Sequence, residues 1–239
     1  MSVVIKHLKR LKGKPPECSA IIAAAGSSQR MAGEDKLFVE ICGAPVLYHT
    51  LAAFQNCNLI KEIIVVARND SFELIGELCE KYSLVKVAKI VEGGSTRLES
   101  VMNGVYAASK KSQLIAVHDG ARPCVDEDVI ERAVIAATKW HAAAPAVPIG
   151  STVKRVEDRR ITETVDRRDL VEIQTPQVFA TEIIKAALTN AIRESIDATD
   201  DCMAVELIGF PIHITEGSSK NIKLTTQDDL FVAEAILGN

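Results

Sequence analysis

The chain alternates between short apolar runs of strand length and longer stretches with helical spacing, and this alternation constrains the fold more than any other feature. The expected strands cover residues 19–26, 62–67, 85–94, 114–123 and 142–149. The expected helices cover residues 45–57, 70–83, 95–110 and 126–141. Apolar residues crowd the strands, as they do in parallel sheets that are covered on both faces. The alternation predicts an α/β protein with a Rossmann-like, doubly wound, mostly parallel sheet.

The pattern changes after Gly150, where residues 151–172 become charged and β-branched. Segments 153–157 and 161–165 alternate with a period of two residues around a polar turn, which predicts a hairpin. This β arm is either an exposed ribbon or a ribbon that reaches a neighbouring subunit. Because an isolated two-stranded ribbon is only marginally stable, we favour contact with a second subunit and expect a homodimer.

Two more helices are expected at residues 180–195 and 199–209. Residues 210–238 indicate a strand, a loop, a short strand and a final helix. We therefore expect a short N-terminal extension at residues 1–17 and one domain at residues 18–239 that carries the arm.

Composition excludes several classes of protein. Lys and Arg number 28 against 32 Asp and Glu, so the net charge is −4, and nucleic-acid binding, which needs a basic surface, is not expected. No apolar run approaches the roughly 20 residues of a membrane span. The basic N-terminus lacks the apolar core of a secretory signal and indicates a peripheral extension, with an amphipathic targeting segment as the alternative. The six cysteines lack metal-binding spacing, so we expect reduced thiols, no structural zinc and a cytoplasmic protein.

Ligands of doubly wound folds bind beyond the carboxyl ends of the strands, so the loops that follow the strands are the candidate site. The first strand ends in the small residues Ala23, Ala24, Ala25 and Gly26. Backbone N–H groups of such a loop can surround a phosphate, and the cations Arg30 and Lys36 that follow suit a triphosphate. The loop lacks the glycine fingerprint of dinucleotide-binding proteins and of P-loops, which disfavours a dehydrogenase.

Two further loops have the same character. Gly93, Arg97 and Ser100 lie where the third strand passes into a helix. The fourth strand ends in Asp119, followed by Gly-Ala and then Arg122. An aspartate at this position can hold a divalent cation or a sugar hydroxyl, and the fork of an arginine can pair with a phosphate. We interpret the neighbouring His118 as a packed side chain rather than a catalyst, because no nucleophile pattern accompanies it.

The chain resembles the 2-C-methyl-D-erythritol 4-phosphate cytidylyltransferases over residues 18–238. The resemblance is carried by eight stretches in order: AAAGSSQRM with a following DK, GGSTRLESV, VHDGARP, STVKR, TVDRRDL, TPQVF, ATDD and NIKLTT. It implies a reaction in which CTP and 2-C-methyl-D-erythritol 4-phosphate give the CDP-linked alcohol and pyrophosphate, with Mg²⁺. It also implies a dimer formed through the β arm.

The resemblance also implies roles for individual residues. Arg30 and Lys36 match residues that stabilise the transition state. The nucleotide-binding residues that it implies are Ala23, Ala24, Ala25, Gly26, Gly93, Arg97, Ser100, Asp119 and Ala121. The residues that it implies for the sugar phosphate are Arg122, Thr152, Arg167 and Lys223. Arg167 lies in the arm, so in a family-like dimer it would serve the partner's site. Asp119 is also the candidate ligand for the metal.

The first loop departs from the family pattern. Asp35 stands where a proline is usual, Leu37 replaces a common glutamine, and Gln29 replaces a frequent basic residue. These substitutions remove rigidity and add negative charge beside the triphosphate. We expect them to affect loop order and CTP affinity rather than the chemistry.

Two alternative functions stay open at this point. One is a cytidylyltransferase that acts on D-ribitol 5-phosphate, which shares the fold and the first loop. Thr152 and the run that ends at Arg167 favour the methylerythritol substrate over this one. The other is a nucleotide-binding module without catalysis, which would have no reason to keep Arg30, Lys36, Arg167 and Lys223.

Overall fold

The computed structural model describes residues 16–26 and 35–238. Most of the extension predicted at residues 1–17 lies outside the described residues, and so do Gln29 and Arg30. Within the described ranges, no helix combines the length and the apolar content needed to cross a bilayer.

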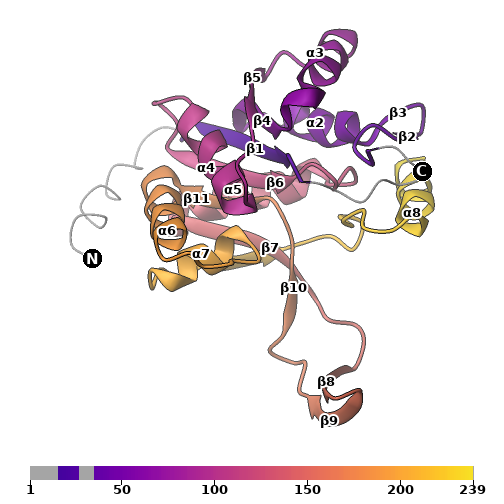
Figure 1. The fold of residues 1–239 in the computed structure, drawn as a ribbon, viewed down its shortest axis with the longest axis vertical. Coiled ribbons are helices and arrows are strands. Elements are labelled where there is room, and N and C mark those ends of the chain that lie inside the picture. The colour runs from indigo at the N-terminus through magenta and orange to yellow at the C-terminus, as the bar shows by residue number, and fades with distance from the viewer. Residues whose placement is uncertain (1–15, 27–34, 239) are drawn as a thin grey trace.

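An eight-stranded sheet forms the centre of the molecule (Figure 1). Its strands are β1 (Cys18–Ala24), β4 (Ile60–Ala67), β5 (Val87–Glu92), β6 (Leu114–Asp119), β7 (Ala142–Pro148), β10 (Val171–Ile173), β11 (Gln177–Ala180) and β12 (His213–Glu216). The order is β10-β7-β11-β6-β1-β4-β5, and β12 also pairs with β7. The strands from β6 to β5 run parallel, whereas β11 runs antiparallel to both β6 and β7. The predicted fold class, a mostly parallel α/β sheet, is confirmed.

Helices cover this sheet in two groups. They are α2 (Val46–Asn56), α3 (Phe72–Lys81), α4 (Arg97–Ala107), α5 (Glu127–Trp140), α6 (Thr181–Arg193), α7 (Asp201–Leu207) and α8 (Asp228–Leu237). Helices α2 and α5 pack against one another, and α4 packs against α6, which in turn contacts α7. The central strands are buried along nearly their whole length, which explains their continuous apolar sequences.

The order of the strands places a crevice beside β1. The chain leaves β1 for β4 and β5 on one side and then returns to β6 on the other side. This reversal is a topological switch point, where the loops that follow neighbouring strands separate and leave room for a ligand. The three candidate loops of the sequence, which follow β1, β5 and β6, therefore meet at one edge of the sheet, beside the end of β4.

The predicted arm is a hairpin that projects from the body of the molecule (Figure 1). Strands β8 (Val153–Glu157) and β9 (Arg160–Val165) pair antiparallel. Asp158 and Arg159 join them in the left-handed region, with φ of 47° and 62°, as a two-residue turn of the I′ type requires. Nearly all arm residues are exposed in the single chain, including the apolar Val156 and Ile161.

Some local details differ from the sequence expectations. The strands β10 and β11 were not predicted, because each contains only a few residues. The short strand expected before the final helix is irregular chain in the structure. The helix α4 begins with a capping box between Thr96 and Glu99. All six cysteines are free thiols, and four of them are buried.

Candidate active site

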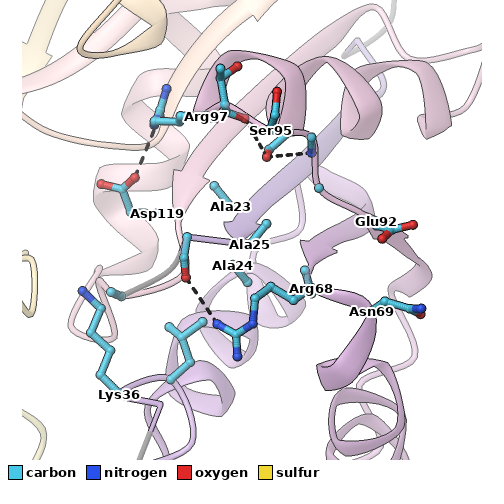
Figure 2. Close-up of a pocket in the computed structure, with 18 of the residues that line it drawn as sticks. Ala23, Ala24, Ala25, Lys36, Arg68, Asn69, Glu92, Ser95, Arg97 and Asp119 are labelled. Atoms are coloured by element: carbon cyan, nitrogen blue, oxygen red, sulfur yellow. Dashed lines mark hydrogen bonds and ion pairs between the residues drawn. The ribbon is translucent and has the colours of Figure 1, made fainter. Parts of the chain in front are cut away.

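A pocket of about 700 Å³ opens at the switch point. Its lining comes from the ends of β1, β4, β5 and β6, from the start of α4 and from the segment before α8. The predicted residues that line it are Ala23, Ala24, Ala25, Gly26, Lys36, Gly93, Arg97, Ser100, Asp119, Ala121 and Lys223. Figure 2 shows the three alanines in the centre, with Asp119 on one side and Glu92 and Asn69 on the other. Residues that are far apart in the sequence therefore meet in one pocket.

The first loop and the glycine loop approach each other closely. A Cβ atom on Gly93 would lie only 2.4 Å from the Cβ atom of Ala25 and 3.0 Å from Ser100 Oγ. Only glycine fits this position without a shift of its neighbours. The absence of large side chains keeps backbone groups accessible to a ligand at this end of the pocket.

The helix α4 begins at the pocket, and its cap shapes the glycine loop. The Thr96 side chain accepts a hydrogen bond from Glu99 N, and the Glu99 carboxylate accepts bonds from the backbone of Ser95 and Thr96. Ser100 Oγ accepts from Gly94 N at 3.0 Å and donates to the Thr96 carbonyl oxygen at 2.8 Å. In this structure the Ser100 hydroxyl therefore holds the loop in shape, in addition to lining the pocket.

Asp119 is the centre of a charged cluster on the pocket floor. Its carboxylate lies 3.0 Å from Lys223 Nζ, 3.3 Å from Arg122 Nε and 3.8 Å from Arg97 Nη2. Burial alone would raise the pKa of Asp119, but the three neighbouring cations outweigh burial and lower it to about 2. Asp119 is therefore ionised at any physiological pH.

Arg97 is held from its other side by Asp201. The distance from Arg97 Nη2 to Asp201 Oδ2 is 2.7 Å, and Asp201, at the start of α7, is fully buried. Burial raises the pKa of Asp201, while the Arg97 guanidinium acts in the opposite direction. Gln177 fixes the backbone that carries this carboxylate, because its Oε1 accepts hydrogen bonds from Asp201 N and Cys202 N. Arg97 therefore enters the pocket in one defined orientation.

Lys36 enters the pocket from the side opposite Arg97 (Figure 2). Its Nζ donates to the Leu224 carbonyl oxygen at 3.0 Å, and Leu224 N in turn donates to the Ala121 carbonyl oxygen. Burial, together with the nearby Lys223 ammonium, lowers the pKa of Lys36. Two lysines that share one pocket make it attractive to a polyanion.

Arg122 is not among the residues that line the pocket. Its side chain is buried; its Nε donates to Asp119 at 3.3 Å, and its Nη1 donates to the Asn221 carbonyl oxygen at 2.7 Å. These two contacts support Asp119 and the segment that carries Lys223. Direct contact of Arg122 with the sugar phosphate stays a prediction.

His118 is a packed side chain, as predicted. It is fully buried, its Nδ1 lies 2.9 Å from Thr175 Oγ1, and its ring packs on Phe54. Burial lowers the pKa of His118 to about 4, so the imidazole is neutral.

The remaining predicted residues lie outside this pocket or outside the described ranges. Thr152 and Arg167 are exposed at the base of the arm, where Arg167 donates to the Gly150 and Ile149 carbonyl oxygens. Neither residue lines the pocket of its own chain. Arg30 is not among the described residues.

The structure adds residues that were not selected from the sequence. Arg68 and Asn69 follow β4 and line the pocket, together with Glu92 at the end of β5. The signal for Arg68 and Asn69 was their position directly after the strand predicted at residues 62–67, and Glu92 lies near the end of the strand predicted at residues 85–94. Asp201 lies within the ATDD stretch, but its pairing with Arg97 depends on a contact between α4 and α7 that one sequence does not reveal.

The pocket is cationic and lies at the switch point of a doubly wound sheet. Beside it runs a loop whose small side chains leave backbone groups accessible to a ligand. This arrangement is that of a nucleotidyltransferase. The family model for 2-C-methyl-D-erythritol 4-phosphate cytidylyltransferase matches residues 18–239. The chain belongs to this family of enzymes.

Curated relatives agree with the family assignment. A protein of Halalkalibacterium halodurans named 2-C-methyl-D-erythritol 4-phosphate cytidylyltransferase is 44% identical over 222 residues, which are 92% of this chain and 97% of that protein. One of the same name from Caldanaerobacter subterraneus is 46% identical over 92% of this chain and 98% of its own length.

Solved structures of similar proteins share the whole fold. The 4-diphosphocytidyl-2C-methyl-D-erythritol synthase of Anaerococcus prevotii superposes with a TM-score of 0.83 at 32% identity, covering 94% of this chain and 97% of that one. The 2-C-methyl-D-erythritol 4-phosphate cytidylyltransferase of Thermus thermophilus gives 0.79 at 33% identity, covering 93% and 100%.

Proposed function

We propose that the chain transfers CMP from CTP to 2-C-methyl-D-erythritol 4-phosphate in the described pocket and releases pyrophosphate. The observation that carries this proposal is the meeting of Lys36, Lys223 and Arg97 in one pocket beside the small-residue loop. Family membership supplies the identity of the two substrates.

The reaction asks the protein for positioning and charge rather than for a nucleophile. A phosphate oxygen of the sugar alcohol attacks the α-phosphorus of CTP and forms a new P–O bond. The bond from the α-phosphorus to the oxygen bridging to the β-phosphate breaks, and pyrophosphate leaves with that electron pair. Both reactants are anions, so cations must offset their repulsion and the charge that develops on the leaving group.

The pocket offers distinct regions for the parts of CTP. The backbone of Ala23 to Gly26 would hold the triphosphate, with Arg30 and Lys36 stabilising the transition state. Gly93, Arg97, Ser100, Asp119 and Ala121 would hold the cytidine. The close packing of Gly93 on Ala25 supports the proposal that the triphosphate and the cytidine bind next to each other.

A magnesium ion fits this pocket if the triphosphate supplies most of its ligands. Along the described lining, Asp119 and Glu92 are the carboxylates, and Asp119 is ionised and shielded from solvent. Asp119 is therefore the residue that would hold the ion from the protein side. Magnesium often takes only one or two carboxylates in addition to substrate phosphates. When bound, it would neutralise negative charge on the phosphates.

The acceptor would bind near Lys223, and the arm of a second subunit would complete this part of the site. Thr152 and Arg167 lie at the arm base and do not line their own pocket. The exposure of Val156 and Ile161 also favours a partner that covers the arm. In the resulting homodimer, Arg167 would contact the sugar phosphate bound by the partner.

Pyrophosphate release by the purified chain with Mg²⁺ and CTP tests the proposal. The two acceptors to compare are 2-C-methyl-D-erythritol 4-phosphate and D-ribitol 5-phosphate. We expect release with the first alone. Release with the second alone would keep the nucleotide half of the site but reject the acceptor. CTP binding without release in either case would favour a binding module.

A further inference from the structure

Arg68 connects the two described ends of the first loop. It is the residue directly after β4, and its side chain extends into the pocket beside Ala24 and Ala25 (Figure 2). Its Nη2 lies 2.9 Å from Asp35 Oδ2, and its Nη1 donates to the Gly26 carbonyl oxygen at 3.5 Å. One guanidinium therefore contacts both the exit of β1 and the residue before Lys36.

Asp35 uses its other groups to build the turn that carries Lys36. Its Oδ1 accepts a hydrogen bond from Leu37 N at 3.1 Å, and its carbonyl oxygen accepts one from Phe38 N at 2.9 Å. Leu37 is buried, and its carbonyl oxygen accepts from Leu47 N in α2. The backbone around Lys36 is thus fixed on both sides, by Asp35 and by α2.

The Asp35–Arg68 ion pair is better shielded than the second ion pair of the same arginine. Arg68 Nε also contacts Asp70 Oδ1 at 3.1 Å. The Asp70 side chain is 72% exposed, whereas that of Asp35 is 15% exposed. Water screens the pair with Asp70 more strongly, so Asp35 is the partner that can hold the arginine in place.

We propose that the Asp35–Arg68 ion pair is a clamp that sets the position of Lys36 against the small-residue loop. Arg68 is then a positioning residue for the transfer reaction, and this step rests on the proposed function. Lys36 reaches the phosphates on a flexible four-carbon stem, so the position of its backbone limits where its ammonium can lie. The clamp also pairs the carboxylate next to Lys36 with a cation, which offsets the negative charge that Asp35 brings to the loop.

The clamp itself is tested without substrate by hydrogen exchange. The variant Arg68→Gln removes the charge but keeps a polar side chain, and Asp70→Asn is the matched control because it removes only the exposed partner. We expect the Leu37 and Phe38 amides to exchange about fivefold faster in Arg68→Gln, from the usual strength of a partly exposed ion pair. Equal exchange in Arg68→Gln, Asp70→Asn and the unaltered chain would overturn the clamp.

The consequence for the reaction is tested by a double-mutant cycle. Arg68→Gln and Asp35→Asn should each lower kcat/KM for CTP about fivefold, with the KM for the sugar phosphate unchanged. Since the two residues form one clamp, the double variant should be no worse than either single variant. Asp70→Asn should keep full activity. If the two losses simply multiply in the double variant, the residues act independently and the proposal is wrong.

These two measurements also separate the clamp from the proposed function. An unaltered chain that releases no pyrophosphate with either acceptor rejects the function. The exchange comparison decides whether the clamp exists in either case.

Discussion

Replacing Asp119 by asparagine should lower the free energy of unfolding by about 2 kcal/mol at pH 7. The pKa of this buried carboxyl is about 2, against 3.8 for an unperturbed aspartate. Each pKa unit corresponds to about 1.36 kcal/mol, so a pKa that is lowered by nearly two gives a loss of this size. The asparagine also leaves Arg97, Arg122 and Lys223 facing a neutral amide instead of a shared anion.

The same pKa fixes how this effect depends on pH. The carboxyl has a lower pKa in the folded chain than in the unfolded chain, so its contribution is complete above pH 3.8. It decreases as the pH falls toward 2. At pH 3 the unfolded chain is mostly protonated at this site while the folded chain is still mostly ionised. About half of the contribution to the free energy of unfolding then remains.

Urea denaturation of the unaltered chain and of Asp119→Asn, at pH 7 and at pH 3, measures both quantities. Asp197→Asn is a suitable control because it removes an exposed carboxylate. The difference in unfolding free energy between the unaltered chain and Asp119→Asn should be half as large at pH 3 as at pH 7. The corresponding difference for the control Asp197→Asn should stay near zero at both pH values. A difference that is the same at pH 7 and at pH 3, or one below about 0.5 kcal/mol at pH 7, would refute the electrostatic reasoning.

Further predictions concern the reaction and the packing of the pocket. Lys36→Ala should lower kcat by about 10²–10³ in the pyrophosphate assay with an unchanged melting temperature, and a loss below tenfold would contradict its role. Arg167→Ala should mainly raise the KM for the sugar phosphate, and mixing it with Lys36→Ala should restore some activity if subunits share sites; no recovery argues against sharing. Gly93→Ala should destabilise the fold by about 1–3 kcal/mol and weaken CTP binding in calorimetry, because its Cβ would lie 2.4 Å from that of Ala25. Wild-type affinity and stability in this variant would show that the two loops separate easily.

The sequence predicts an element of the fold where the pattern of apolar residues along the chain matches the faces that are buried in the folded protein. The strands β1, β4 and β6 are continuous apolar runs because both of their faces are buried, so their sequences identify them. The strands β10 and β11 contain three and four residues, too few for a periodic signal. Their antiparallel pairing depends on the long excursion of the arm, which brings the chain back beside β7.

In the candidate site, too, some residues could be predicted from the sequence and others could not. Residues that follow strands could be predicted, because the carboxyl ends of parallel strands share one edge of a sheet. The sequence could not show that Arg122 turns under the pocket, because its direction depends on Asn221, nearly a hundred positions away. From the sequence, Asp35 indicated only an added negative charge. Its ion pair with Arg68 could not be predicted, because it depends on the placement of β4 beside β1 in the sheet.

Asp119 explains how the pocket can keep several cations close together. Arg97, Arg122 and Lys223 would repel one another, and the shared carboxylate offsets that repulsion before any substrate binds. Arg97 and Lys223, which are the members of this group that line the pocket, therefore need little reorganisation when an anionic substrate arrives. Asp119 also repels an anion, so it must lie to one side of the phosphates or be bridged to them by a cation. We therefore expect the triphosphate to bind on the side toward Lys36, where the small-residue loop can offer backbone N–H groups.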